Sequence, residues 1–347
     1  MGEKNNVNTP KISICISVHN TDAYLPRCLD SILEQTFQDY EIVLVNNGST
    51  DSSEDIMRAY QKNNPDKLIH IFEQEDRGLA QGRQTGIDHA NGEYITFLDA
   101  DDYVLPTAYE KINDAIEKSQ ADIIEIETLR GETIISSPFT GQVDAKTVLR
   151  EYFSYVNIPT MLWLRTYKRE LFAIDVLPKI YINNEDNFAL PCLLFRAKSV
   201  VFIKEPLHVY SMDNERSVMF KLSQDTSLYM KLYNNKKKVL QQVSHIQQYI
   251  GAEAISKMFD REFHMFMSVV ATNFLFFLPD KINFETKIKD AVEVLPVDDK
   301  DELRHIIEHF IPNTCIIYKL IRMMGIVNAY KIFTFFEYLK RKTGGNK

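Results

Sequence analysis

Three carboxylates lie within four residues of this 347-residue chain, at Asp99, Asp101 and Asp102, directly after the apolar stretch 94–98 (YITFL). Carboxylates this close repel one another unless a cation lies beside them. Mg²⁺ and Mn²⁺ prefer oxygen ligands and keep coordination positions open for water or a diphosphate. The sequence therefore offers a divalent-cation site. The alternative is an acidic helix start, in which Asp101 or Asp102 caps a helix after Pro106.

A second acidic pair, Glu185 and Asp186, precedes the apolar segment NFALPCLLFRA. A carboxylate beside a hydroxyl group can act as a general base. Acidic residues are also favoured in the first turn of any helix. From the residues alone, the helix start is the preferred interpretation of this pair.

The elements that would position these groups alternate along the first third of the chain. Isoleucine or valine at 12, 14, 16 and 18 alternates with smaller residues, which predicts a strand, and a helical apolar stripe follows at 25–33. Further strands are predicted at 41–45, 68–72 and 94–98, with one helix marked by Ile56, Met57 and Tyr60 and another at 79–90. This alternation predicts an α/β fold with a parallel sheet covered on both faces. Ligands of such sheets bind at the carboxyl ends of the strands, which points to the loops 17–21, 46–51 and 99–102.

The middle of the chain is more mixed. A helix to about Ser119, a strand at 121–127 and a hairpin or loops at 130–143 are predicted, followed by helices near 144–154 and 186–197 and short strands near 200–212. From about residue 223 the pattern is helical to the end, which predicts a domain boundary near 220 and a helical C-terminal region over 221–347.

Two long segments, PKISICISVHNTDAYLPRCLDSILEQTFQDYEIVLVNNGSTD and GLAQGRQTGIDHANGEYITFLDADD, resemble the family 2 glycosyltransferases. The resemblance covers roughly residues 10–220. It implies the GT-A fold, with a mainly parallel central sheet between helices, a nucleotide-binding half at about 10–105 and an acceptor half at about 106–220. It also implies a nucleotide-sugar donor, a Mn²⁺ or Mg²⁺ ion and usually inversion at the anomeric carbon.

The resemblance also implies roles for individual residues. Asp99 and Asp101 match the DxD motif that serves the metal and the donor, and Asp186 matches the ED motif as the catalytic base, with Glu185 orienting the site. His208 is a further candidate metal ligand, and Trp163 is the candidate acceptor-binding residue. The implied donor-binding residues are Ser17, Val18, His19, Asn47, Arg83, Asp99, Ala100 and Asp101.

Three of these candidates have structural alternatives. Trp163, the only tryptophan, could stack on a sugar or lie in the core. His208 could ligate a metal or be a buried structural histidine. Arg83 could neutralise diphosphate or sugar oxygens, or could be a surface arginine on an exposed helix face.

The chain departs from the family pattern at three positions. Family members commonly have aspartate at position 47, where the carboxylate accepts the N3–H of uracil. Asn47 can still accept through its carbonyl oxygen, but it can also donate and so could meet the N3 acceptor of cytosine. The other departures are Asp76 and Gln84, where asparagine is usual. A UDP-sugar remains the predicted donor.

Charge is unevenly distributed along the chain. The 40 Lys and Arg against 48 Asp and Glu give a net charge of −8, which argues against a nucleic-acid binder. Residues 313–347 alone carry seven Lys and Arg against one Glu, so they contribute +6 and the rest of the chain −14. Mixed with many apolar residues, this composition favours a helix on an anionic membrane surface. The alternative is a helical hairpin that packs on the domain or on a second subunit.

The four cysteines are scattered without a CxxC pair, which predicts neither a zinc site nor a disulfide framework. No secretory signal and no run of about 18 apolar residues is visible, so we expect a cytoplasmic protein, peripheral to the inner face of the membrane if 313–347 binds there. The predicted activity is transfer of a hexosyl or N-acetylhexosaminyl group to a hydroxyl of a glycan, a lipid-linked oligosaccharide or a glycoprotein. The alternatives are a sugar-phosphate nucleotidyltransferase and a non-catalytic subunit of a glycosyltransferase complex. A homo-oligomer is compatible with the helical end.

Overall fold

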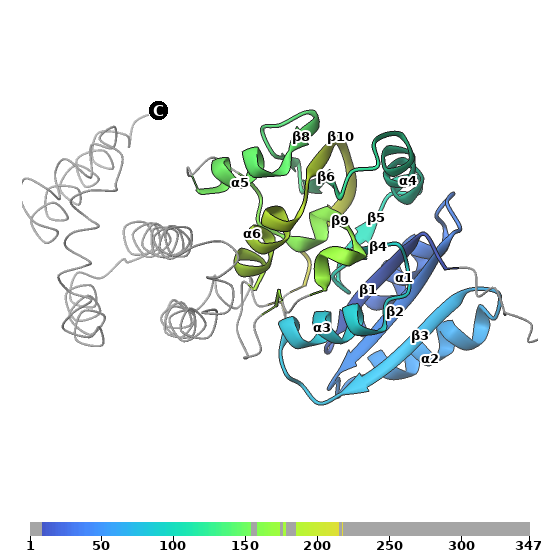
Figure 1. Cartoon of the computed structure of the whole chain (residues 1–347). Helices are drawn as coiled ribbons and strands as arrows, with labels where there is room; N and C mark the ends of the chain where they lie inside the picture. Colours follow the sequence, from blue (N-terminus) through green and yellow to red (C-terminus); the bar gives the residue numbers. More distant parts are fainter. Residues whose placement is uncertain (1–8, 154–157, 174–175, 178–184, 215–216, 218–347) are drawn as a thin grey trace, which may run out of the picture. The chain divides into compact units, whose positions relative to one another are not determined.

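The computed structural model describes residues 9–153, 158–173, 176–177, 185–214 and 217. The predicted boundary near 220 and the helical region 221–347 lie outside these residues. In the described part, one sheet runs through the molecule and helices flank it (Figure 1).

The first four strands confirm the parallel sheet that the sequence predicts. They lie in the spatial order β3-β2-β1-β4, and each neighbouring pair is parallel. The strands are β1 (Ile12–Val18), β2 (Tyr40–Asn47), β3 (Leu68–Gln74) and β4 (Tyr94–Phe97), and the helices between them are α1 (Leu25–Leu33), α2 (Ser53–Asn63) and α3 (Leu79–His89).

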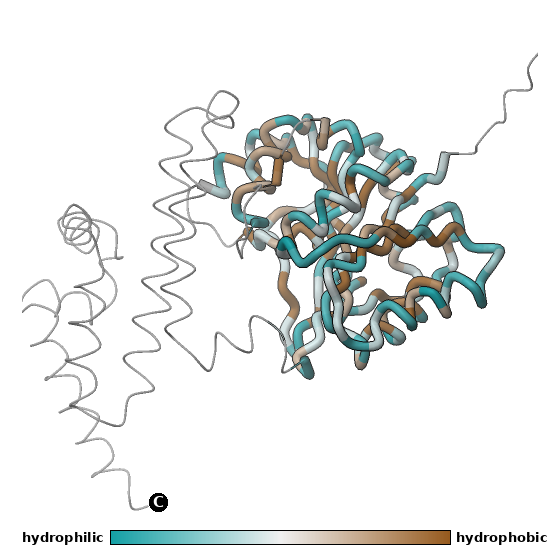
Figure 2. The backbone as a smooth tube through the Cα atoms, turned by 90° about the horizontal axis from the view of Figure 1, so that it is seen from below, coloured by the Kyte–Doolittle hydropathy of each residue, from teal (hydrophilic) through white to brown (hydrophobic). Residues whose placement is uncertain are grey.

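Helices cover both faces of this sheet, as predicted. On β1, Ile12, Ile14 and Ile16 pack into one buried cluster with residues of α1, α2 and α4 (Ala108–Ser119). Cys15, which points to the other face, packs into a second cluster with residues of α3, α5 (Ala145–Phe153) and α6 (Asp186–Arg196). Figure 2 shows the corresponding hydrophobic strands within a more hydrophilic helical surface.

Beyond β4 the sheet becomes mixed, which the sequence did not predict. The next strands in space are β9 (Arg165–Lys168), β6 (Ile123–Arg130), β10 (Ser199–Tyr210) and β5 (Tyr103–Val104). Strand β9 is antiparallel to both of its neighbours, whereas β6 and β10 are parallel. The remaining elements are β7 (Thr133–Ile135), β8 (Gly141–Asp144), and the 3-10 helices η1 (Leu162–Leu164) and η2 (Arg169–Phe172).

Strand β10 replaces the short strands expected near 200–212 and carries the end of the described chain back to the first half. It pairs with β5, which follows the acidic loop 99–102, so that His208 is opposite Val104. Residues after β10 therefore lie beside the carboxyl end of β4.

Within the described part of the chain, Cys15, Cys28 and Cys192 are buried free thiols, in agreement with the absence of a disulfide framework. No helix in this part is both long enough and apolar enough to cross a membrane.

Candidate active site

The loops after β1 and β2 meet at the carboxyl end of the sheet. The Asn20 backbone N–H donates to Ser49 Oγ at 3.2 Å, and the Thr50 N–H donates to Asn20 Oδ1 at 2.7 Å. Asn20 has a φ of 52°, a left-handed conformation that asparagine tolerates better than most residues. Asn20 thus holds the turn of its loop, and the two predicted loops do come together.

Helix α3 begins against this pair of loops. A Cβ atom at Gly82 would lie 2.9 Å from Ser17 Cβ, so only glycine permits the observed approach of α3 to β1. Val18 is buried, Ser17 is half-buried, and His19 is exposed, with its Nδ1 2.8 Å from the Asn47 carbonyl oxygen. Three of the predicted donor-binding residues therefore line the start of this edge.

Asn47 lies at the end of β2, but its side chain is 2 % exposed and both of its polar atoms form hydrogen bonds. Its Oδ1 accepts from Gln74 Nε2 at 2.6 Å and from the Arg77 N–H at 3.3 Å. Its Nδ2 donates to Asp76 Oδ1 at 3.3 Å. The amide thus fixes the loop between β3 and α3.

Arg83 joins the two acidic motifs. Its Nη1 donates to Asp186 Oδ1 at 2.6 Å and also to Glu185, and its Nη2 donates to Asp99 Oδ1 at 2.9 Å. The side chain is 3 % exposed, which excludes the surface-arginine alternative. Carboxylates more than 80 residues apart in the sequence thus meet around one guanidinium.

This cluster has more negative than positive charge, because one guanidinium faces three carboxylates. Burial raises the pKa of the Asp186 carboxyl, and Arg83 only partly opposes it. Burial and then the Asp186 carboxylate raise the pKa of Glu185 to about 8, against the opposing effect of Arg83. The site therefore contains carboxyl groups that are more basic than usual, as a general base requires.

Glu185 is at the N-cap position of α6, which is where the helix-cap interpretation puts it. Its side chain makes no capping hydrogen bond, however, and is directed to Arg83 instead. Asp186 also accepts a hydrogen bond from the Leu162 backbone. Both carboxylates therefore bind Arg83 and do not cap the helix.

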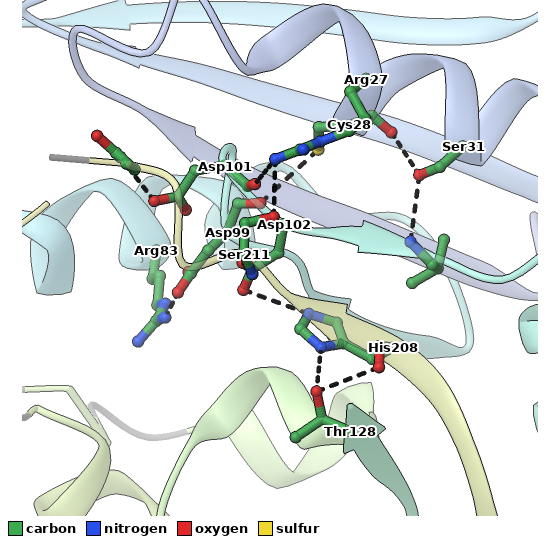
Figure 3. Close-up of polar contacts among 12 residues, drawn as sticks. Arg27, Cys28, Ser31, Arg83, Asp99, Asp101, Asp102, Thr128, His208 and Ser211 are labelled. Carbon is green, nitrogen blue, oxygen red and sulfur yellow. Dashed lines mark hydrogen bonds and ion pairs between the residues drawn. The ribbon is translucent and has the colours of Figure 1, made fainter. Parts of the chain in front are cut away.

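The acidic loop 99–102 forms a turn beside β10 (Figure 3). Asp101 Oδ2 accepts from Asn214 Nδ2 at 2.7 Å, and Asp102 Oδ1 accepts from the Ser211 N–H at 2.8 Å. Thr107 is the N-cap residue of α4, so the alternative in which Asp101 or Asp102 caps this helix is wrong. Ala100 is buried in the apolar cluster beneath the turn.

The carboxylates of this loop repel one another, and burial and this repulsion raise the pKa values of Asp101 and Asp102. Burial and then the Asp99 carboxylate raise the pKa of Asp101. Burial and then the Asp99 and Asp101 carboxylates raise the pKa of Asp102 to about 9. A cation beside the loop would relieve this repulsion.

His208 lies behind the acidic loop. Its Nδ1 is 2.8 Å from the Thr128 hydroxyl, and its Nε2 is 3.4 Å from Asp102 Oδ2. Neither Nε2 nor this Oδ2 has a hydrogen-bond partner in the described region. Burial lowers the pKa of His208 to about 3, so that the imidazole is neutral at physiological pH.

The described residues contain no group of three His, Cys, Asp or Glu side chains arranged to hold a metal ion. The predicted ligand set Asp99, Asp101 and His208 is therefore not assembled. The donor chemistry nonetheless fits a divalent cation, because carboxylate oxygens that repel one another lie near a neutral imidazole.

Trp163 lies in the core rather than on an open surface. It is 5 % exposed, and its indole stacks on His208 at 4.3 Å and on Tyr210 at 5.9 Å between ring centroids. Trp163 is therefore a core residue, which was the alternative to stacking on a sugar, and its indole packs against the imidazole of His208.

Sequence reasoning missed several residues that complete the site. Thr128 of β6 contacts His208, and Ser211 and Asn214, which follow β10, contact the acidic loop. Tyr210, at the end of β10, stacks on Trp163. The sequence could have indicated residues 211–214, because they are a polar segment at the end of a predicted strand. Ligands of open α/β sheets bind at the ends of strands.

Comparisons with known proteins show what this chain is similar to. The sequence model of the family described as Glycosyl transferase family 2 matches residues 13–130. The chain is 33% identical over 211 residues to the uncharacterized glycosyltransferase EpsJ of Bacillus subtilis, covering 58% of this chain and 61% of that protein. It is 42% identical over 213 residues to the glycosyltransferase GlyA of Streptococcus pneumoniae, covering 58% of this chain and 30% of that protein. The chain thus spans less than two thirds of the length of both relatives.

Among solved structures, residues 1–349 of TarS from Staphylococcus aureus, crystallised in complex with UDP-GlcNAc, superpose with a TM-score of 0.64. The match covers 94% of this chain and 92% of that chain at 15% identity. At this identity the likeness concerns the fold alone, and it confirms the predicted GT-A fold.

Proposed function

We propose that this chain, whose residues 13–130 belong to glycosyl transferase family 2, is an inverting, metal-dependent glycosyltransferase that uses a UDP-sugar. The acceptor is a hydroxyl group of a glycan, a lipid-linked oligosaccharide or a glycoprotein. The transferred group is a hexose or an N-acetylhexosamine.

The observation that carries the proposal is the cluster around Arg83. Asp99 follows β4, at the edge where nucleotides bind, whereas Asp186 begins α6 in the second half of the fold. Arg83 contacts both carboxylates. A donor group and a proton acceptor are thereby held close together, as a transfer between two bound substrates needs.

The nature of the donor is supported by the fold relative TarS, whose structure contains UDP-GlcNAc. In this chain Asp99 and Asp101 are the residues that would hold a divalent cation at the diphosphate. When bound, the cation would supply positive charge to the departing nucleotide.

Asp186 performs the proton transfer in this proposal. Its carboxylate accepts the proton of the acceptor hydroxyl while the oxygen forms a bond to the anomeric carbon. The bond from this carbon to the diphosphate oxygen breaks with its electron pair, and UDP leaves from the opposite face. The raised pKa of Asp186 makes it a stronger base, and Glu185 and Arg83 hold it in place.

The test uses the full chain and a set of UDP-sugars, with hydrolysis and transfer measured in Mn²⁺ with and without a chelator. We expect chelation to abolish turnover. Asp186→Asn should abolish transfer and leave UDP binding nearly unchanged, whereas Asp114→Asn, a surface carboxylate on α4, should have no effect. Full transfer activity in Asp186→Asn would remove Asp186 from the role of base.

A further inference from the structure

We propose that Asp76 determines the base specificity of the donor site by accepting the N3–H of uracil through its exposed carboxylate oxygen. This inference rests on the proposed function, because it concerns the nucleotide of the same donor. It assigns to the loop between β3 and α3 a role that sequence reasoning gave to Asn47.

The Asn47 side chain has no acceptor left for the N3–H of uracil, because its Oδ1 already accepts two hydrogen bonds and its Nδ2 can only donate. The Arg77 backbone N–H can only donate, so the Asn47 atom beside it is the carbonyl oxygen. The Thr85 hydroxyl donates to Gln74 Oε1 at 2.6 Å, which turns the Gln74 amino group toward the same oxygen of Asn47. The Asn47 amino group then faces Asp76.

Asp76 is the exposed member of this network. Its Oδ1 accepts from Asn47 Nδ2 at 3.3 Å and from the Gly78 N–H at 2.9 Å. None of the hydrogen bonds found among the described residues reaches its Oδ2. The side chain is exposed, so this oxygen is available to a ligand.

The backbone holds Asp76 at the nucleotide-binding edge. A Cβ atom at Gly48, the residue after β2, would lie 2.5 Å from the Asp76 nitrogen. The loops after β2 and β3 are therefore in direct contact. They lie at the carboxyl ends of adjacent parallel strands, where nucleotides bind to open α/β sheets.

A carboxylate oxygen at this place discriminates between pyrimidines. Uracil has a donor, N3–H, between two carbonyl oxygens, whereas N3 of cytosine has no proton and is itself an acceptor. An acceptor facing N3 therefore pairs with uracil and repels cytosine.

The two departures at positions 47 and 76 become one matched change. An aspartate at position 47 would put a second carboxylate within hydrogen-bonding distance of Asp76, and the two charges would repel. The amide of Asn47 avoids this repulsion and fixes the Asp76 carboxylate. Asparagine at position 47 is thus the residue that is compatible with aspartate at position 76.

The experiment is calorimetric titration of the full chain and of Asp76→Asn with UDP and with CDP. In the variant, the Asn47 and Gly78 donors hold the side-chain oxygen, so the new amino group takes the place of Oδ2. We expect UDP binding to weaken by about tenfold to a hundredfold, as for loss of a hydrogen bond to a charged group, and CDP binding to be unchanged or tighter.

Glu75→Gln is the matched control, because it removes the same charge from the neighbouring exposed position. We expect it to change the Kd for UDP by no more than about twofold. If Asp76→Asn binds UDP as tightly as the wild type, this inference is overturned and the proposed function is not. If the wild type binds CDP at least as tightly as UDP, both the inference and the proposed UDP donor are overturned.

Discussion

Arg83 is the residue whose contacts make the site one unit. Its guanidinium offers donors in a planar fork, and both terminal nitrogens are used, toward Asp99 on one side and toward Glu185 and Asp186 on the other. Because these groups are buried together, removing the cation would leave uncompensated charges inside the protein. Arg83 is therefore a positioning residue for the three carboxylates.

The substitution Arg83→Lys tests this role while keeping the charge. A lysine ammonium cannot bridge Asp99 and Asp186 in the same way, because it lacks the planar fork. With about 1.5–3 kcal/mol for each lost hydrogen bond to a charged group, we expect kcat for transfer to fall by about tenfold to a hundredfold. Steady-state kinetics with the UDP-sugar identified by screening would measure it.

Arg77→Lys provides the comparison for Arg83→Lys. Arg77 is exposed in the loop before α3 and keeps its backbone contact to Asn47 in either variant. We expect wild-type kcat for Arg77→Lys. A wild-type kcat in Arg83→Lys, with the same thermal unfolding midpoint, would show that the bridge has no role in the reaction.

Local sequence could not predict this bridge. The pair Glu185 and Asp186 does begin helix α6, as its composition suggests, but the local sequence does not show that both side chains contact Arg83. The resemblance to a family selected Arg83, Asp99 and Asp186 together, and the structure shows that Arg83 contacts both carboxylates. That all three meet at hydrogen-bonding distance depends on the packing of α3 against the second half of the fold.

At the scale of elements, helix α3 sets the geometry of the donor edge, and its glycines allow its close packing. It contacts both β1 and β2. A Cβ atom at Gly82 would collide with Ser17, whereas one at Gly86 would lie 3.1 Å from Cys15 Cβ, a tight but tolerable distance. Both glycines lie inside a helix, where alanine is intrinsically favoured by about 1 kcal/mol.

We therefore expect Gly82→Ala and Gly86→Ala to differ. Gly82→Ala should destabilise the protein by about 1–3 kcal/mol through overpacking and should also weaken UDP binding, because Ser17 and the β1 loop must shift. Gly86→Ala should change stability by less than about 1 kcal/mol, since helix propensity offsets the contact. Thermal unfolding and UDP titration of both variants would measure this. Equal effects in both would refute the packing argument.

The elements that the sequence missed are short or have unusual burial. Strand β9, RTYK, contains a buried arginine, Arg165, whose charge is paired with buried Glu125 at 2.6 Å. No apolar alternation marks such a strand. The expected parallel strands were long and apolar, and each was found within a few residues of its predicted bounds. The alternation of apolar and polar residues predicts strands whose buried side chains are apolar. It fails for a strand such as β9, whose buried side chains include a charged residue in an ion pair.

At the scale of the whole molecule, charge separates two regions of the sequence. Residues 1–312 have a net charge of −14, whereas 313–347 have +6 among many apolar side chains. The acidic total suits a protein that does not bind nucleic acid. It says nothing against contact of the basic end with an anionic surface, because electrostatic attraction is local and is screened within about 10 Å.

This leads to a prediction about vesicles. If 313–347 lies on an anionic membrane surface, each basic residue contributes about 1 kcal/mol to binding. Replacing Lys340, Arg341 and Lys342 by glutamine should then weaken binding of the full chain to phosphatidylglycerol-containing vesicles by about a hundredfold. Co-sedimentation at low and high salt would measure it, and the wild type should be released as salt rises.

The control replaces Lys62, Lys118 and Lys198, three exposed lysines of the described part, by glutamine, which changes the net charge equally. Equal losses in both variants would mean that total charge governs binding, and no binding by the wild type would favour packing of 313–347 against protein.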